Sequence, residues 1–245
     1  MADHSIYKDI AERTGGDIYI GVVGPVRSGK STFIKRFMEQ LVIPNIADPY
    51  RAERARDELP QSGSGKTIMT SEPKFVPEEA VEICPDGTTS FRVRMIDSVG
   101  YMVDGALGSD EDGQQRMIMT PWSDVAMPFA EAAAIGTEKV TREHSTVGIL
   151  VTTDGSFSDI PRENYVSAEE RVVRELRESG KHHLLILGGS AEICGQDCTS
   201  FLCRHRLFFF CGSGITKNIA VCIRSGRAFF SGRFFRIGRR QNRIG

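Results

Sequence analysis

The chain has 245 residues, a formal net charge of −1, 40% hydrophobic and 26% charged residues. This composition is ordinary for a soluble protein with a sizeable core, and its balanced charge favours no nucleic-acid partner. The first 13 residues lack the basic start and apolar run of a secretory signal, and no stretch approaches 18 apolar residues. We therefore expect a cytosolic protein with one large α/β domain.

Residues 17–24, with the sequence DIYIGVVG, are rich in β-branched residues and end in glycine, which predicts a buried strand. From Ser31 the apolar residues recur at helical spacing until Pro44, which predicts an amphipathic helix. Between them the sequence GPVRSGKS, residues 24–31, matches GxxxxGK[ST]. Strand, glycine loop and helix are the context that a phosphate-binding P-loop requires.

A phosphate-binding loop needs many hydrogen-bond donors in a small volume. Gly24 and Gly29 permit backbone conformations that turn N–H groups inward, and the helix N-terminus adds partial positive charge. We expect Lys30 to reach the β- and γ-phosphates and Ser31 to bind Mg²⁺, whereas Arg27 either contacts phosphate or faces solvent. The predicted nucleotide-binding residues are Gly24, Pro25, Val26, Arg27, Ser28, Gly29, Lys30, Ser31, Thr32 and Gly100.

A second motif follows downstream. The segment FRVRMID, residues 91–97, predicts a strand that ends in Asp97, and Gly100 completes the pattern DxxG. Alone this pattern is usually only a turn, but after a P-loop the aspartate is expected to hold Mg²⁺ and the Gly100 amide to meet the γ-phosphate. The predicted catalytic residues are Lys30, Thr70 and Asp97, and the predicted metal ligands are Ser31 and Asp97.

Two further positions bear on the γ-phosphate. A hydroxyl residue from a loop commonly completes the Mg²⁺ and γ-phosphate shell, and Thr70 is the first choice for it, with Thr67 second. An ordinary strand threonine is the alternative. No glutamine follows Gly100 to position water, since Tyr101 stands there, so we expect slow hydrolysis.

Three further predictions concern the segments between and after these motifs. Residues 47–66 are predicted to be a mobile surface segment, in which three arginines form a solvated face or a charge-stabilising finger. Residues 80–84 and 90–97 are predicted to pair as a hairpin. Residues 101–128 are predicted to be a long insertion. The arginines are Arg51, Arg54 and Arg56.

The remaining elements alternate between strand and helix. Residues 129–143 predict a helix and residues 145–152 a buried strand. Ser167 and Glu170 predict a capping box before a helix through Glu178, and residues 183–187 predict a further strand. This alternation implies an α/β fold with parallel strands.

Four stretches together resemble the stage IV sporulation protein A family, over about residues 6–187. They are AERTGGDIYIGVVGPVRSGKSTFIKRFME, DELPQSGSGKTIMTSEPKFVPEEAVEI, IDSVGYMV and HSTVGILVTTDGSFSDIPRENYVSAEERV. The resemblance implies a P-loop NTPase with a GTPase-like, mostly parallel sheet flanked by helices. It implies Lys30 and Ser31 as Walker A residues, Asp97 as the Walker B residue and Thr70 as the sensor threonine.

The resemblance also implies a function, an ATPase that uses ATP and Mg²⁺ to drive self-assembly of the basement layer of the spore coat. It implies mother-cell cytoplasm at the outer forespore surface, peripheral membrane attachment through a small amphipathic membrane-anchoring sporulation peptide, and other coat proteins as partners. A nucleotide-binding scaffold without turnover and a GTPase are the alternatives. No guanine-reading Asn-Lys-x-Asp motif is visible.

The tail departs from this resemblance. Residues 181–245 hold 11 of the 31 Lys and Arg but only 2 of the 32 Asp and Glu, and five of the six cysteines follow residue 193. We interpret residues 1–187 as the ATPase domain and 188–245 as a non-matching basic tail, the product of a frameshift or poorly ordered. We expect a chain without the family's distal domains to assemble poorly. The alternatives are a nucleic-acid or anionic-membrane surface and a zinc site from Cys194, Cys198, Cys203, His205 and Cys211.

Overall fold

A five-stranded sheet organises the part of the chain that the computed structural model describes, residues 15–60, 72–85, 87–111, 113–155 and 158–188. Four of its strands run parallel, and β2 at one edge is antiparallel. The prediction of a mostly parallel sheet flanked by helices is therefore confirmed. In spatial order the strands are β2 (Lys74–Ile83), β3 (Phe91–Asp97), β1 (Asp17–Val23), β8 (Val147–Thr153) and β9 (His182–Gly188).

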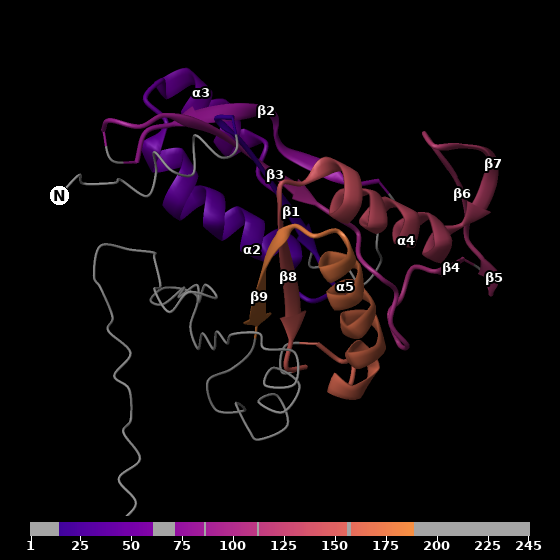
Figure 1. Cartoon of the computed structure of the whole chain (residues 1–245). Helices are drawn as coiled ribbons and strands as arrows, with labels where there is room; N and C mark the ends of the chain where they lie inside the picture. Colours follow the sequence, from indigo (N-terminus) through magenta and orange to yellow (C-terminus); the bar gives the residue numbers. More distant parts are fainter. Residues whose placement is uncertain (1–14, 61–71, 86, 112, 156–157, 189–245) are drawn as a thin grey trace, which may run out of the picture.

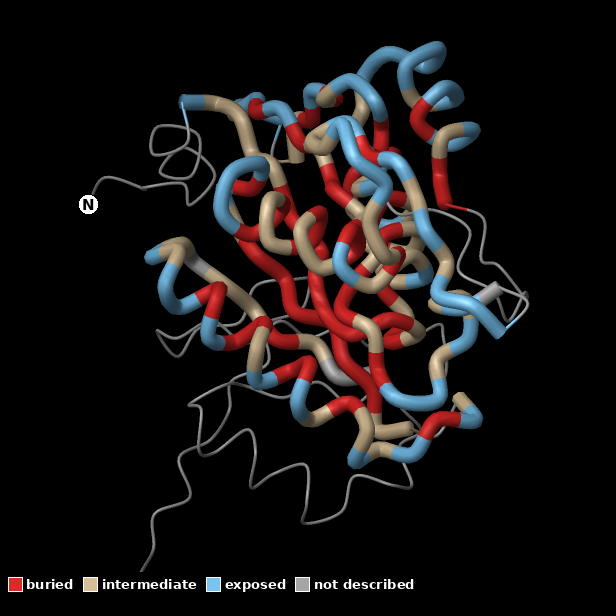
Figure 2. The backbone as a smooth tube through the Cα atoms, turned by 90° about the vertical axis from the view of Figure 1, so that its right-hand side faces the viewer, coloured by how far each residue is buried: buried red, intermediate tan, exposed pale blue. Residues whose placement is uncertain are grey.

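Helices cover both faces of this sheet (Figure 1). On one side lie α2 (Lys30–Phe37) and α3 (Pro49–Asp57), and on the other lie α4 (Phe129–Lys139) and α5 (Val166–Glu178). Successive strand residues point to opposite faces, so Val22 joins the apolar cluster under α2 while Val23 joins the cluster under α5. Figure 2 accordingly shows the buried residues gathered along the strands and the exposed ones on the outer sides of the helices.

Shorter elements extend the helices and form the predicted insertion. The turn η1 (Met38–Val42) and η2 (Ile43–Asn45) follow α2, η3 (Val140–His144) follows α4, and η4 (Arg162–Tyr165) precedes α5. Residues 101–128 contain two small sheets, made of β4 (Asp110–Glu111) with β5 (Gln114–Gln115) and of β6 (Met117–Thr120) with β7 (Ser123–Pro128). Within the described ranges, no helix has the length and apolar character needed to span a membrane.

The prediction of a mobile surface segment at residues 47–66 is wrong for its first part, which forms α3. The Asp48 side chain accepts a hydrogen bond from the Tyr50 amide at 3.0 Å, and Pro49 occupies the first turn. An aspartate cap followed by proline is a helix-start signal. The high charge of the segment obscured it, because α3 packs only a narrow face on the protein, with Ala55 buried.

The predicted capping box before α5 is also wrong. Ser167 and Glu170 lie inside the helix, which begins at Val166 after the turn η4. Tyr165 occupies the N-cap position and provides no side-chain cap. Tyr165 is fully buried, so packing rather than capping fixes where this helix starts.

The packing of α5 on β8 generates a prediction. A Cβ atom built on Gly148 would lie 2.3 Å from Cδ2 of Leu176, a core side chain that is 1% exposed. We expect Gly148→Ala to lower the unfolding free energy by about 1–3 kcal/mol through overpacking. In a Leu176→Ala background, which makes room, the same change should cost less. Urea denaturation of the four proteins measures this coupling, and strictly additive effects would contradict it.

Candidate nucleotide-binding site

The neighbouring strands β1 and β3 bring the two sequence motifs together. Val22 pairs with Asp97 in parallel register, so the loops that follow both strands leave the same edge of the sheet. The loops are then joined by backbone hydrogen bonds, from the Tyr101 amide to the Gly24 carbonyl at 3.2 Å and from the Val26 amide to the Tyr101 carbonyl at 2.9 Å. The P-loop and the DxxG segment therefore form one unit.

Gly24 and Gly100 are required by close contacts in this unit. A Cβ atom on Gly100 would lie 2.3 Å from the Gly24 carbonyl oxygen and 2.6 Å from Nζ of Lys30. A Cβ atom on Gly24 would lie 2.1 Å from the Val151 carbonyl oxygen. Real Cβ atoms do not approach backbone oxygens so closely, and Gly100 also has a positive φ of 99°.

Lys30 lies inside the loop rather than at its surface. The side chain is 5% exposed, and Nζ donates to the Pro25 carbonyl at 2.6 Å. Burial lowers the pKa of Lys30 to about 8, and the negative charge of Asp97 partly offsets this effect. The predicted neighbourhood of Lys30 and Asp97 is thus present, with the ammonium group drawn inward by a backbone carbonyl.

Ser31 and Asp97 are in direct contact. The Ser31 hydroxyl donates to Oδ2 of Asp97 at 2.6 Å, while Oδ1 of Asp97 is buried and has no hydrogen-bond partner among the described residues. Burial raises the pKa of Asp97, against the Ser31 hydrogen bond and the charge of Lys30. A carboxylate and a hydroxyl are hard oxygen ligands, and the free carboxylate oxygen gives a cation a place to bind, so this pair fits Mg²⁺.

The P-loop backbone turns through left-handed residues on both sides of Ser28. Arg27 has a φ of 59° and Gly29 a φ of 90°. Backbone of this kind turns successive N–H groups to one side and makes an anion-binding concavity. Ser28, one of the predicted nucleotide-binding residues, is 1% exposed, and its hydroxyl has no hydrogen-bond partner among the described residues.

Two residues that follow the aspartate of the DxxG motif form hydrogen bonds with α4 and α5, the helices on the side of the sheet opposite α2. The Gly100 amide donates to Oγ1 of Thr137 on α4 at 3.0 Å. The Tyr101 hydroxyl donates to Oε2 of Glu175 on α5 at 2.5 Å, and the Arg171 guanidinium lies 4.1 Å from the Tyr101 ring centroid. Sequence reasoning missed Thr137, because a threonine inside a helix carries no distinguishing signal.

Some sequence predictions lie outside the described residues, namely Thr67, Thr70 and the tail from residue 189. The arginines of α3 lie within the described residues. Arg54 forms ion pairs with Glu58 at 2.9 Å and Glu79 at 3.8 Å. These exposed pairs favour the solvated-face interpretation over the charge-stabilising finger.

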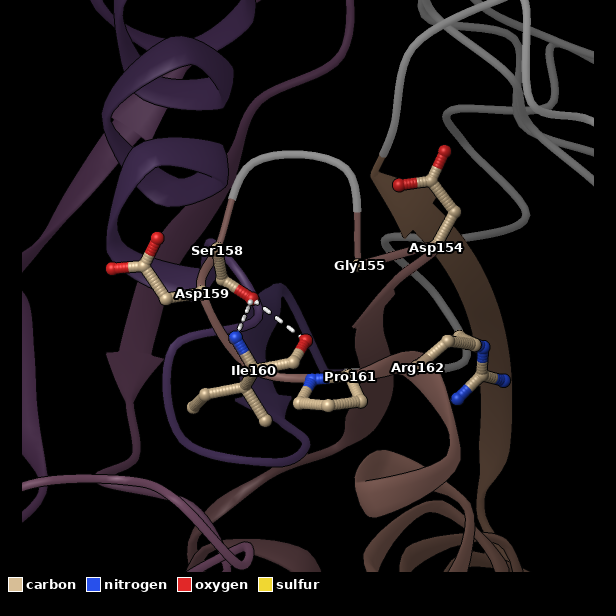
Figure 3. A pocket seen from close by; sticks show the side chains of 7 residues that line it. All are labelled: Asp154, Gly155, Ser158, Asp159, Ile160, Pro161 and Arg162. Carbon is tan, nitrogen blue, oxygen red and sulfur yellow. Dashed lines mark hydrogen bonds between the residues drawn. The ribbon is translucent and has the colours of Figure 1, made fainter.

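A cavity of about 360 Å³ lies at the carboxyl end of β8 (Figure 3). Because β8 runs parallel to β1, this cavity opens at the same edge of the sheet as the P-loop. Figure 3 shows the Ser158 hydroxyl turned toward the Ile160 backbone, with which it makes two 3.3 Å hydrogen bonds. The cavity is lined by Asp154, Gly155, Ser158, Asp159, Ile160, Pro161 and Arg162.

A buried carboxylate anchors one wall of this cavity to α5. Glu169 is fully buried and receives hydrogen bonds from Thr152 on β8 and from Arg162 at 2.7 Å. Burial raises the pKa of Glu169 to about 7, although the charge and hydrogen bond of Arg162 act in the opposite direction. The network therefore ties the end of β8, the cavity wall and α5 together.

The family model of the stage IV sporulation protein A ATPase domain matches residues 1–202. The chain belongs to this family. Stage IV sporulation protein A of Clostridioides difficile strain 630 is 60% identical over 185 residues, and that of Bacillus subtilis strain 168 is 56% identical over 187 residues. In each case the match covers 76% of this chain but only 38% of the relative, so the chain spans well under half of their length.

Solved structures similar to the chain include an Aquifex aeolicus Era variant bound to GDP and AlF₄⁻. It is 12% identical with a TM-score of 0.43, and the match covers 81% of this chain and 51% of that one. A variant of SsGBP gives a TM-score of 0.38 at 16% identity, over 84% of this chain and 51% of that one.

Gly100 offers a direct test of the site. Gly100→Ala places a methyl group against the Gly24 carbonyl and Lys30, so we expect nucleotide affinity to fall by about 100-fold or more. Gly105→Ala is the matched control, since Gly105 also has a positive φ of 88° but its Cβ would meet nothing closer than 3.9 Å. Calorimetric titration with nucleotide measures both, and equal losses would contradict the close-contact argument.

The Glu169 network predicts a pH dependence of stability. Since the folded-state pKa of about 7 lies above the ordinary 4.5, this carboxyl contributes stability that is complete below pH 4.5 and is lost as pH rises to 7. The loss amounts to about 3 kcal/mol. We expect the difference in unfolding free energy between the wild type and Glu169→Gln to shrink over this range and then to level off. A difference independent of pH would contradict the assignment.

Proposed function

We propose that the chain binds ATP with Mg²⁺ and hydrolyses it, and that this turnover drives self-assembly of the spore coat basement layer. The observation that carries the proposal is the convergence of Lys30, the Ser31–Asp97 pair and Gly100 at one edge of the sheet. The relatives of 56 to 60% identity are sporulation proteins, which supports the cellular setting.

The chain's own residues fit the electrostatic needs of phosphoryl transfer. Lys30, once it leaves the Pro25 carbonyl for a phosphate oxygen, gains an anionic partner that favours its charged form. Ser31 and Asp97 would hold Mg²⁺, which supplies charge neutralisation on the phosphate oxygens when bound. The P-loop amides orient the phosphates, and Thr70 is proposed to sense the γ-phosphate.

We also propose partners and a cellular location for the protein, on the basis of its membership of the family. The partners are further copies of the chain, other coat proteins and a small amphipathic membrane-anchoring peptide. The place is the mother-cell cytoplasm at the forespore surface, with the protein peripheral to the membrane. Because this chain spans 38% of its relatives, assembly and attachment concern the whole family protein.

Removal of Lys30 tests the hydrolase proposal. We expect Lys30→Ala to lower Mg²⁺-dependent phosphate release from ATP by about 100-fold or more, because the change removes the buried ammonium group that lies inside the loop. Lys35→Ala, a half-buried lysine later in the same helix, is the matched control and should release phosphate normally. Undiminished release from purified Lys30→Ala protein would refute the assignment.

A scaffold that binds nucleotide without turnover is the second candidate, favoured by one observation. Tyr101 stands directly after the DxxG motif, and its hydroxyl is committed to Glu175, so it does not orient water at the phosphates. Saturable ATP binding without Mg²⁺-dependent phosphate release would identify such a scaffold. Displacement of bound ATP by excess GTP would instead identify a GTPase.

A further inference from the structure

The hydrogen bond between Gly100 and Thr137 joins the nucleotide site to α4. The Gly100 amide donates to Oγ1 of Thr137 at 3.0 Å, and that hydroxyl donates its own hydrogen to the Ala133 carbonyl at 2.8 Å. Thr137 is fully buried. The hydrogen bond to Ala133 therefore fixes the orientation of the Thr137 hydroxyl on α4. Its oxygen is a fixed acceptor for the Gly100 amide.

Gly100 is at the same time part of the nucleotide site. A Cβ atom on it would lie 2.6 Å from Nζ of Lys30 and 2.3 Å from the Gly24 carbonyl oxygen, so its backbone borders the lysine. An amide has one hydrogen and makes one strong hydrogen bond. A phosphate oxygen that engages the Gly100 amide must therefore take it from Thr137.

We propose that Thr137 is a positioning residue that holds the Gly100 peptide when no γ-phosphate is bound, and that a nucleoside triphosphate must displace this bond to complete its contacts. The inference rests on the proposed function, because it assumes a nucleotide at the P-loop. Thr137 does not touch the nucleotide. It sets the energy difference between the diphosphate and triphosphate states of the site.

This arrangement distinguishes the two nucleotides by a simple competition. A nucleoside diphosphate has no γ-phosphate, so it leaves the Gly100 bond to Thr137 intact. A triphosphate gains a charge-assisted hydrogen bond at Gly100 but loses the neutral one to Thr137. Removal of the Thr137 hydroxyl abolishes that loss and so favours the triphosphate alone.

The neighbouring residue shows why the exchange is confined to one peptide. The Tyr101 amide is bonded to the Gly24 carbonyl, and the Tyr101 side chain is bonded to Glu175. Tyr101 is 3% exposed, so these partners have no water to replace them. The Gly100 peptide is flanked by this fixed anchor, and glycine at a φ of 99° has the backbone freedom to reorient.

The test compares Thr137→Val, which keeps the shape but removes the hydroxyl, with Thr137→Ser, which keeps the hydroxyl. Calorimetry measures Kd for ADP and for AMPPNP, a non-hydrolysable ATP analogue, with Mg²⁺. We expect Thr137→Val to bind AMPPNP about fivefold more tightly, with ADP affinity unchanged, and Thr137→Ser to keep the wild-type ratio. An unchanged ratio in Thr137→Val, or equal shifts for both nucleotides, would overturn the inference.

A measurement on the wild type makes the test independent of any variant's folding. The ¹⁵N–¹H resonance of Gly100 should move much further from its position in the free protein when AMPPNP binds than when ADP binds. A resonance that stays in place with bound AMPPNP would overturn the inference alone. Failure of the wild type to bind either nucleotide would overturn the proposed function, and this inference with it.

Discussion

The close approach of two backbone loops is the constraint on which the candidate site depends. Pairing of Val22 with Asp97 brings the loops to one edge, and the absence of side chains at Gly24 and Gly100 lets them meet around Lys30. This contact excludes water from the lysine, which lowers its pKa to about 8. A buried amine is costly when its one hydrogen bond among the described residues goes to a neutral carbonyl, so the loop is arranged for an anion.

The two charged groups at this edge respond to burial in opposite senses, and both shift toward neutrality. Burial lowers the pKa of Lys30 and raises that of Asp97. Each group favours the charged form of the other, but burial outweighs this effect in both, and Oδ1 of Asp97 has no partner among the described residues. A ligand that brings phosphate to the amine and a cation to the carboxylate satisfies both, which explains why the two belong in one site.

Local sequence predicted the part of this site that follows from strand order. Alternating strands and helices fix parallel neighbours, and so the contact of Ser31 with Asp97 was foreseeable although 66 positions separate them. The contact of Gly100 with Thr137 could not be foreseen, because nothing in the sequence distinguishes Thr137 from the other inward-facing residues of α4. Burial of Tyr165 likewise overrode the capping pattern at Ser167.

Gly100 and Tyr101 are adjacent, but their hydrogen bonds to the helices differ in how much free energy is needed to break them. This difference limits how the segment can respond to a nucleotide. Release of Tyr101 from α5 would strip a buried carboxylate of its hydroxyl partner, which is an expensive change even though Arg171 also contacts Glu175 at 3.0 Å. Release of the Gly100 amide costs one neutral hydrogen bond, which a phosphate oxygen replaces. The proposed response to a triphosphate therefore reorients one peptide against a fixed neighbour, without a swing of the whole loop. Such a response reaches α4, which holds Thr137 and begins where the Phe129 amide bonds the Arg116 carbonyl at the base of β6.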